Sequence, residues 1–247
     1  ERRFWWFVGK GLLVERLSEE WFPKEGEFLD LGCGTGANLD RVEGRGKWTG
    51  ADLSPRAVSF CAERGHRLLV LSEAGRLPFR DGSLDGAMAL DLFEHLEDDR
   101  ATVTELTRCL RPGGRVLVTV PAYPFLWSSH DVAMGHFRRY SRGSLMSLLS
   151  GAGLIILKVT HFPGLLFPAL FAGRMFQKFA GDAGDTISYD WPGFANRSLI
   201  AFVRLELSLL SRFSMPWGTT LAAVCEKPSG EFSPGPDRRT SWPSFRS

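Results

Sequence analysis

Three glycines, Gly32, Gly34 and Gly36, follow the short apolar segment 28–31 and precede a helical pattern at 38–42. An apolar run, closely spaced glycines and a helix start are typical of a strand, a tight turn and a helix. Because glycine has no Cβ, the backbone of such a turn can approach a ligand closely and can adopt positive φ. The N–H groups and the positive end of the following helix would face that ligand. The stretch therefore predicts a nucleotide-binding loop.

An acidic residue, Asp52, follows this loop at a distance that suits ribose binding. It lies at the end of the predicted strand 47–53, and open α/β sheets bind ligands at the carboxyl ends of their strands. A carboxylate at this place can accept hydrogen bonds from both ribose hydroxyls. Gly32, Gly34 and Ala37 also satisfy the relaxed dinucleotide fingerprint, so the spacing leaves NAD and S-adenosylmethionine both open.

A second group of chemically capable residues lies in segment 121–141, which combines aromatic side chains with two histidines and two arginines. Loops at the carboxyl edge of a sheet often carry function. His130 and His136 are candidate catalytic bases because imidazole titrates near neutral pH. The alternative is that each histidine is a structural anchor of the loop. Four side chains of this segment are predicted to bind substrate: Trp127, Arg138, Arg139 and Tyr140. The last three would bind a carboxylate or phosphate group of the acceptor.

These residues are predicted to lie at one edge of a parallel sheet. Apolar runs of strand length alternate with helical patterns, which is typical of a doubly wound α/β fold because parallel strands need crossover connections. Ser54 and Pro55 are predicted to cap and start one of the helices. Strands are predicted at 28–31, 47–53, 66–71, 84–90, 115–120, 154–161 and 219–226, and helices at 55–64, 98–110 and 143–151.

Composition narrows the class of protein. The chain has 247 residues, of which 44% are apolar and 23% charged, as expected for one globular α/β domain with an elaboration. A net charge of +2 does not favour nucleic acid as a partner, so a small molecule is predicted. The four cysteines form no C-x-x-C pair, and neither a metal site nor a disulfide framework is predicted. The scattered cysteines indicate a reducing compartment, and a cytoplasmic location is expected. The chain begins at Glu1 and not at Met, and no signal peptide is recognisable. It has no long uncharged apolar run, so no spanning helix is predicted.

Four parts are predicted along the chain. Residues 1–25 form an aromatic helix, which either packs on the sheet or acts as a lid over the substrate. Residues 26–161 with 218–227 form the ligand-binding domain, and 228–247 form a disordered tail. Residues 162–217 form a helical apolar insertion with an amphipathic helix at 197–213. It is predicted to cover a pocket, or alternatively to contact a membrane or admit a lipid-like substrate.

With these segments placed, the chain resembles class I S-adenosylmethionine-dependent methyltransferases of the type 11 kind over residues 28–160 and 219–226. The resemblance implies a Rossmann-like seven-stranded sheet whose last strand is antiparallel. The loop SSHDVAMGHFRRYS, 128–141, is similar to that of a bacterial subgroup associated with envelope or glycosyl-transfer pathways. The motifs that carry the family resemblance are LDLGCGTG (29–36), ADLSPRAV (51–58), SEAGRLPFRDGSLDGAMALDLFEHLED (72–98) and LRPGGRVLVTVP (110–121).

The resemblance assigns S-adenosylmethionine as cofactor. Its methionine end would lie on Asp30 and the glycine loop, its ribose on Asp52, its adenine on Glu73 and Ala74, and its methyl group beside Asp91. Many relatives have Asp where Glu73 stands. Glu94 and His95 are interpreted as the entry to a helix and not as a base. The complete set of predicted cofactor-binding residues is Asp30, Gly32, Cys33, Gly34, Gly36, Asp52, Leu53, Glu73, Ala74 and Asp91.

The predicted function is methyl transfer to a small-molecule acceptor, with a hydroxyl oxygen as the preferred acceptor atom. A lipid-linked or envelope-related molecule is a candidate acceptor. Peripheral contact with the inner face of the membrane is compatible with this function. The alternative is a non-catalytic protein that binds S-adenosylmethionine and docks on a partner or membrane. An NAD-linked oxidoreductase fits the loop spacing but not the later segments. The sequence makes no prediction about the oligomeric state.

Overall fold

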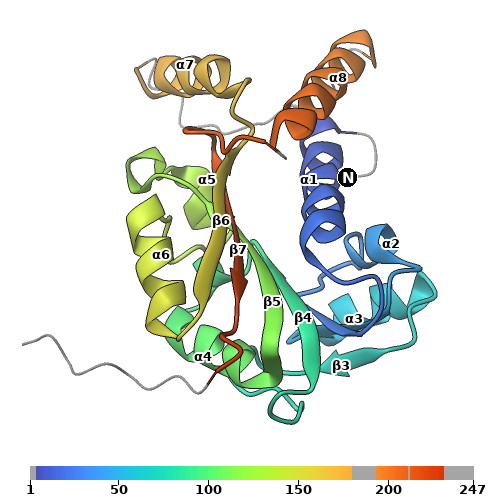
Figure 1. The fold of residues 1–247 in the computed structure, drawn as a ribbon. Coiled ribbons are helices and arrows are strands. Elements are labelled where there is room, and N and C mark those ends of the chain that lie inside the picture. Colours follow the sequence, from blue (N-terminus) through green and yellow to red (C-terminus); the bar gives the residue numbers. More distant parts are fainter. Residues whose placement is uncertain (1–3, 180–192, 211, 231–247) are drawn as a thin grey trace, which may run out of the picture.

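The computed structural model describes residues 4–179, 193–210 and 212–230, so most of the predicted tail lies outside the described residues. Within them, seven strands form one sheet in the order β3-β2-β1-β4-β5-β7-β6 (Figure 1). The strands are β1 (Glu27–Leu31), β2 (Lys47–Asp52), β3 (Leu69–Leu71), β4 (Leu84–Leu90), β5 (Leu110–Pro121), β6 (Ile155–Phe162) and β7 (Thr220–Glu226).

The first five strands are parallel to one another, and β7 is antiparallel to both of its neighbours, β5 and β6. The seven-stranded Rossmann-like sheet with an antiparallel last strand is therefore confirmed. Strand order reverses between β1 and β4, and the carboxyl ends of these two central strands lie side by side. Ligands of open α/β sheets bind at such a reversal point.

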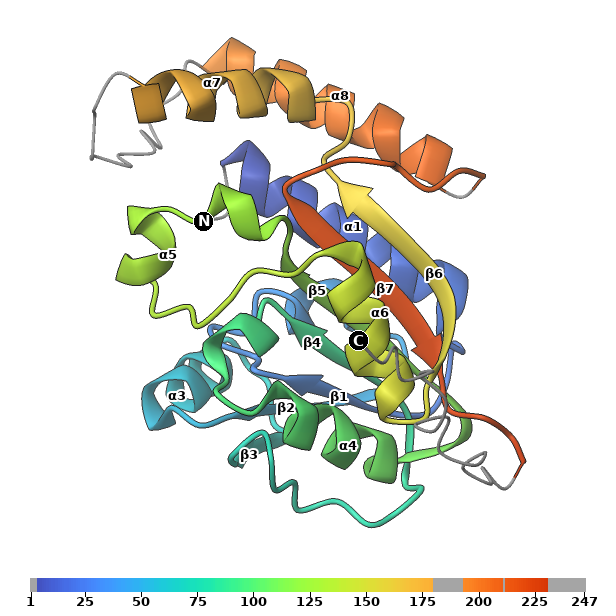
Figure 2. The same ribbon diagram turned by 90° about the vertical axis from the view of Figure 1, so that its left-hand side faces the viewer.

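Helices cover both faces of the sheet (Figure 1). α1, α2 and α3 lie on one side, and α4 and α6 lie on the other. A helical insertion, α7 and α8, precedes β7 as predicted and lies across the end of the molecule above β6 (Figure 2). The helices are α1 (Trp5–Trp21), α2 (Leu39–Val42), α3 (Pro55–Glu63), α4 (Asp99–Cys109), α5 (Ser129–Ala133), α6 (Arg142–Gly151), α7 (Phe167–Phe179) and α8 (Gly193–Leu210), with single 3-10 turns η1 (Phe93–His95) and η2 (Pro124–Leu126).

The N-terminal helix α1 is part of the core. Its residues Leu13 and Leu17 are fully buried against the sheet face that carries Met88 and Leu117. Val203 of α8 packs in the same cluster, so the insertion and α1 share one apolar interface. α1 thus packs on the sheet, while its role as a lid stays a prediction.

Glu206 of α8 anchors the segment that follows β6. Its side chain is buried, and its two carboxylate oxygens accept hydrogen bonds from the N–H groups of Gly164 (2.7 Å) and Leu165 (2.9 Å). This bidentate contact satisfies backbone donors that would otherwise be buried without partners. In the part of the chain that the structure describes, no helix is both long and apolar enough to cross a bilayer.

Some element bounds differ from the prediction for physical reasons. β5 begins at Leu110 and not at 115, because Leu110 already pairs with Leu84 of β4; the register then shifts, and regular pairing resumes between Arg115 and Gly86. β3 is shorter than predicted, and it pairs at the sheet edge with β2 through residues 69–71 alone. The helix after the glycine loop, α2, has four residues and no side-chain cap. Its dipole is therefore small, and loop N–H groups are the main donors toward a ligand.

Candidate functional site

The glycine loop between β1 and α2 is pinned to the neighbouring strand. The N–H groups of Gly32 and Cys33 both donate to the carbonyl oxygen of Ala51 on β2, at 2.8 and 3.1 Å. Gly36 has a φ of +77°, and a Cβ there would lie 3.0 Å from the sulfur of Cys61. At Gly34, with φ +53°, a Cβ would meet its nearest atom only at 4.0 Å, so this side of the loop is open to a ligand.

Asp52, at the carboxyl end of β2, holds the same loop. Its Oδ2 accepts a hydrogen bond from the N–H of Gly34 and its Oδ1 one from that of Ser54, both at 2.9 Å. A carboxylate has about four acceptor positions, so two bonds leave acceptor capacity toward hydroxyl groups. The adjacent Leu53 is 67% exposed, which places an apolar surface beside this carboxylate.

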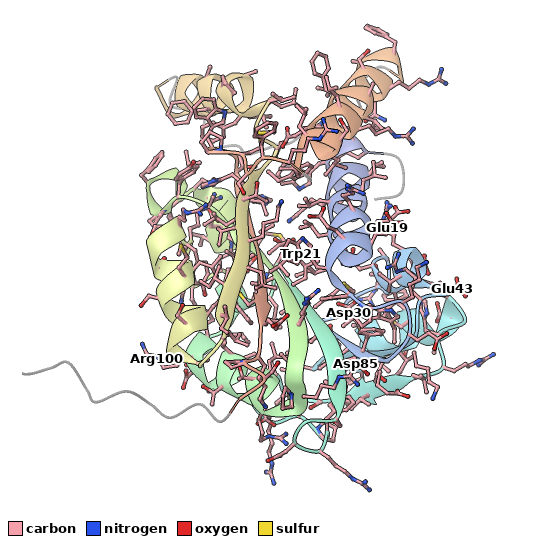
Figure 3. All side chains as sticks on the ribbon, in the orientation of Figure 1. Glu19, Trp21, Asp30, Glu43, Asp85 and Arg100 are labelled. Atoms are coloured by element: carbon pink, nitrogen blue, oxygen red, sulfur yellow. The ribbon has the colours of Figure 1, made fainter. Side chains whose placement is uncertain are left out.

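Asp30, which Figure 3 labels, lies on β1 two residues before Gly32, and its side chain is buried. Its Oδ2 has no hydrogen-bond partner among the described residues. Burial, together with the charge of Asp52, raises the pKa of Asp30 to about 7. An unpaired buried carboxyl group is costly, and a cationic or N–H donor group of a ligand would offset this cost.

The turn after β3 brings two more predicted residues to the same edge. The N–H of Ser72 donates to the carbonyl oxygen of Asp52 at 3.0 Å, which joins the ends of β2 and β3. Glu73 follows with an exposed side chain, and Ala74 is half-buried. The residues predicted to contact ribose and adenine therefore lie at adjacent strand ends.

Asp91, at the carboxyl end of β4, occupies the centre of the edge. Its backbone has a φ of +49°, an uncommon conformation for a residue with a side chain. Its N–H donates to the carbonyl oxygen (2.8 Å) and to Oγ1 (3.1 Å) of Thr119 on β5. Lys10 of α1 forms an ion pair with its carboxylate, and the Lys10 ammonium also lies 5.6 Å from the ring centre of Trp6. The sequence analysis missed Lys10. The feature that could have indicated it is a lysine on the inward side of an aromatic helix.

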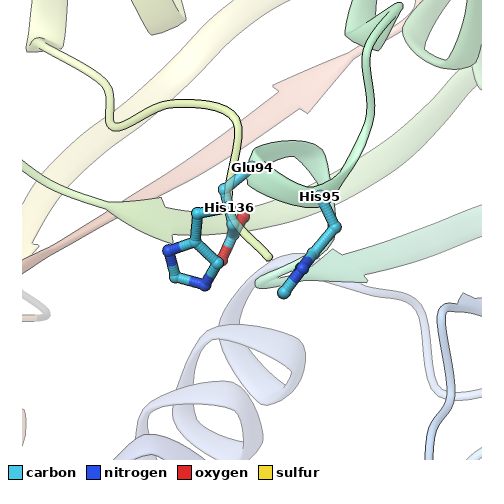
Figure 4. Close-up of side chains that lie close together, drawn as sticks. All are labelled: Glu94, His95 and His136. Atoms are coloured by element: carbon cyan, nitrogen blue, oxygen red, sulfur yellow. The ribbon is translucent and has the colours of Figure 1, made fainter. Parts of the chain in front are cut away.

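Glu94, His95 and His136 form a cluster next to Asp91 (Figure 4). Their potential ligand atoms all lie within 4.8 Å of one another, and the two imidazole rings meet edge to face with centres 4.6 Å apart. The N–H of Phe137 donates to the carbonyl oxygen of Glu94 at 2.6 Å, which ties the loop carrying His136 to η1. Glu94 and His95 do form the single turn expected before α4, but they also face a histidine from a distant part of the chain.

Burial controls the protonation of this cluster. The side chain of Glu94 is buried, and its Oε2 has no hydrogen-bond partner among the described residues. Burial, together with the charge of the nearby Asp91, raises the pKa of Glu94 well above its usual range. Burial, then the neighbouring His136, lowers the pKa of His95. His95 is therefore neutral at neutral pH, and one of its nitrogens carries a lone pair.

Asp131 orients His136. Its Oδ1 lies 2.9 Å from Nδ1 of His136 and accepts a 2.8 Å hydrogen bond from Nε of Arg139. Burial by itself would raise the pKa of Asp131, but Arg139, the N–H of Ser128 and His136 hold that pKa below its usual range. Because an ionised carboxylate only accepts, Nδ1 of His136 donates to it, and Nε2 of the neutral ring carries the lone pair.

The other residues predicted to act on substrate have different surroundings. The Arg139 side chain is 5% exposed and engaged with Asp131. The hydroxyl of Tyr140 donates to Oδ2 of Asp99 at 2.6 Å, and Arg138 pairs with the same carboxylate at 3.0 Å. Arg138 and Tyr140 thus hold the loop against α4, whereas Arg139 binds within the loop; contact of the three side chains with substrate stays a prediction. Trp127 is 40% exposed, whereas His130 is half-buried on α5, outside the cluster of Glu94, His95 and His136.

Comparison with known proteins agrees with this geometry. Residues 29–118 match the family model described as a methyltransferase domain. The chain is 29% identical over 155 residues to the O-methyltransferase cnsE of Penicillium expansum, covering 56% of this chain and 55% of that protein. It is also 29% identical over 168 residues to a probable S-adenosylmethionine-dependent methyltransferase of Mycolicibacterium smegmatis, covering 65% of each. The chain thus spans less than two thirds of these relatives.

A solved structure shares the fold at lower identity. Geranyl diphosphate C-methyltransferase from Streptomyces coelicolor, in complex with Mg²⁺, geranyl diphosphate and S-adenosyl-L-homocysteine, superposes with a TM-score of 0.61 at 14% identity. The superposition covers 88% of this chain and 80% of that one. At this identity the likeness establishes the common fold.

Proposed function

We propose, from the methyltransferase domain matched at residues 29–118, that the chain is a class I S-adenosylmethionine-dependent methyltransferase that transfers the methyl group to a hydroxyl of a small-molecule acceptor. One observation carries the proposal. The segment after β4 connects the two halves of the site: Leu92 packs so closely on Gly32 that a Cβ there would lie 3.0 Å away, and Glu94 is bonded to the loop of His136. Asp91 begins this segment at the carboxyl end of β4.

The cofactor fits the residues on the glycine-loop side. Asp52 has acceptor capacity for the ribose hydroxyls, and the buried Asp30 would be stabilised by the donor groups of the methionine end. Glu73, Ala74 and the exposed Leu53 are assigned to the adenine. Bound S-adenosylmethionine supplies an electrophilic methyl group, and the protein supplies binding, orientation and exclusion of water.

The acceptor is assigned to the side of the edge that holds the cluster. A hydroxyl nucleophile must lose its proton on or before attack. In the protein without a metal ion, Nε2 of His136 is the proton acceptor at this place, since Asp131 holds the ring and favours the imidazolium that forms. This arrangement favours His136 over His130, the second candidate on α5. Asp131 then acts through His136 as a positioning residue.

Aromatic side chains next to this edge favour an acceptor with an apolar part. Tyr123 of the loop after β5 contacts Phe167 of α7 with ring centres 5.6 Å apart, and Phe125 contacts Phe171 with ring centres 6.4 Å apart. Phe125 is nevertheless 60% exposed. An apolar surface open to solvent beside a polar site suits a molecule with an apolar tail and a hydroxylated head, such as a lipid-linked sugar.

The outer face of α8 fits contact with an anionic membrane surface. Phe194, Phe202 and Leu205 are 77%, 52% and 54% exposed, and Arg197 and Arg204 are exposed among them. Exposed apolar side chains next to arginines are typical of helices that lie in the lipid interface. We include peripheral membrane contact in the proposed function because it would bring the site to a lipid-linked acceptor.

Calorimetric titration with S-adenosylhomocysteine, with NAD as the control ligand, tests the cofactor. Micromolar binding of the first and no binding of the second is the expected result. Labelled S-adenosylmethionine is then incubated with the protein and a panel of hydroxylated acceptors that includes lipid-linked sugars. Cofactor binding without transfer to any acceptor would favour the non-catalytic alternative, and binding of neither ligand would contradict the proposal.

A further inference from the structure

We propose that Glu94, His95 and His136 bind one divalent transition-metal ion beside the acceptor position. Two imidazoles and one carboxylate are a frequent ligand set for Zn²⁺, Fe²⁺ and Mn²⁺. The three potential ligand atoms already lie within 4.8 Å of one another. Donors that make bonds of ~2.1 Å in a tetrahedron are separated by roughly 3.4 Å, so small side-chain rotations would close the site.

The buried carboxylate of Glu94 is the independent sign of a missing ligand. The residue is 1% exposed, and its Oε2 has no hydrogen-bond partner among the described residues. Figure 4 shows this carboxylate beside the ring of His136. Buried polar atoms in native proteins are nearly always satisfied, and an unsatisfied one calls for an unseen water, ion or proton.

The charges around Glu94 favour a cation. The groups that act on it are Asp91, Lys10 and Arg139. Lys10 is paired with Asp91, and Arg139 with Asp131 at 2.8 Å. Each neighbouring cation thus has a carboxylate of its own, and neither compensates an ionised Glu94. A divalent ion would compensate it, whereas the competing explanation is a proton on Glu94.

The hydrogen bonds that orient the proposed ligands are those typical of metal sites. A metal-binding histidine usually donates its second N–H to a carboxylate, which fixes the tautomer and the direction of the ring. His136 makes this contact with Asp131 at 2.9 Å, and Asp131 is itself fixed by Arg139. The 2.6 Å hydrogen bond from Phe137 to the backbone of Glu94 holds the two ligand segments together.

Three protein ligands leave coordination positions open for the acceptor, as in catalytic metal sites. Such an ion would polarise the acceptor oxygen and lower the pKa of its hydroxyl. It would also occupy the lone pair of His136, so in the loaded protein the ion would replace the imidazole as the group that activates the hydroxyl. This role rests on the proposed function, whereas binding of the ion does not.

The test measures metal binding without turnover. Protein is stripped with a chelator and titrated with Co²⁺ and Zn²⁺ by calorimetry, and the visible absorption of Co²⁺ reports its ligands. We expect one ion per chain with micromolar Kd. Glu94→Gln, His95→Ala and His136→Ala should each weaken binding at least tenfold. The matched control is His66→Ala, since His66 pairs with Asp40 at 3.0 Å outside the cluster.

X-ray absorption of the Zn²⁺-loaded native chain gives a measurement that needs no variant, and two imidazole ligands with one carboxylate are expected. Absence of binding at millimolar metal, or unchanged affinity in Glu94→Gln and His95→Ala, would overturn the proposal and leave a protonated Glu94. Titration with S-adenosylhomocysteine runs in parallel, so loss of the metal site and failure of the proposed function are distinguished.

Discussion

Lys10 of the N-terminal helix forms an ion pair with Asp91 at the carboxyl end of β4, although the two residues are 81 positions apart in the chain. This contact places α1 over the centre of the candidate site. It also neutralises a carboxylate in a strained backbone conformation, next to the cluster of Glu94, His95 and His136.

Replacing Lys10 with Met should therefore destabilise the protein. The side chains of Lys10 and Asp91 are 19% and 36% exposed, so solvent screens part of the attraction, and we expect a loss of about 1 kcal/mol in the free energy of unfolding. Urea denaturation at neutral pH measures it. Arg16→Met is the matched control on α1, because Arg16 and Glu20 form a more open pair at 3.8 Å. Equal losses in both variants would argue against a specific role for the Lys10 contact.

Asp52→Ala should reduce affinity for S-adenosylhomocysteine at least tenfold. The variant loses the proposed ribose acceptor and also the hydrogen bond that holds the N–H of Gly34. A smaller loss is expected for Glu73→Ala, whose side chain is exposed. Calorimetry measures both. Asp81→Ala, at a highly exposed carboxylate that pairs with Arg108, should bind normally. Normal binding by the Asp52 variant would mean that the cofactor site is misassigned.

His136→Ala should lower turnover by about 10² or more while leaving affinity for S-adenosylhomocysteine unchanged, because the residue lies on the acceptor side of the edge. Initial rates with a methyl acceptor and calorimetry on the same sample separate the two effects. His130→Ala is made in parallel, and a smaller effect is expected from its position on α5. Native turnover in both variants would remove histidine from the mechanism.

The stability of the ligand-free protein should depend on Asp30. Its pKa in the folded protein is about 7, against an ordinary value of 3.8, so between these pH values the folded state holds a proton that the unfolded state has released. Stability then falls as pH rises from 4 to 7, by up to about 4 kcal/mol for a shift of about 3 units. Asp30→Asn should flatten this dependence and gain stability relative to the native chain at pH 8. Urea denaturation of both proteins at pH 5 and pH 8 measures the change in the free energy of unfolding. An equal change in the two proteins would contradict the raised pKa of Asp30.

Contact of α8 with membranes predicts sedimentation with vesicles that contain anionic lipid. Phe202→Ser with Arg204→Ser should reduce the bound fraction severalfold, because both side chains are exposed on α8 and each contributes to binding at the interface. Thr104→Ser on α4 serves as a distant control on an exposed helix face. Equal binding of the native and double-variant proteins would exclude this face as the contact.

Much of the fold follows from local pattern. Apolar runs and the glycines at 32, 34 and 36 suffice to locate β1, β2, β4 and the loop between β1 and α2, since each feature acts over a few residues. The N-cap Ser54 and the start of α3 at Pro55 are predicted for the same reason and are confirmed. The predicted bounds of β3 and β5 are less accurate, because a strand ends where its neighbour stops pairing, and the neighbour lies elsewhere in the chain.

The sequence by itself determined the type of sheet and the residues at the strand ends, because periodicity and turn chemistry are local properties. Only the tertiary structure decided what those residues contact. It paired Lys10 with Asp91, engaged Arg139 with Asp131, and brought His136 to Glu94 and His95. These contacts depend on which loops meet at one edge of the sheet and on which carboxylates are buried there. Distance and burial determine both the pairing and the pKa of such groups, and the local sequence determines neither distance nor burial.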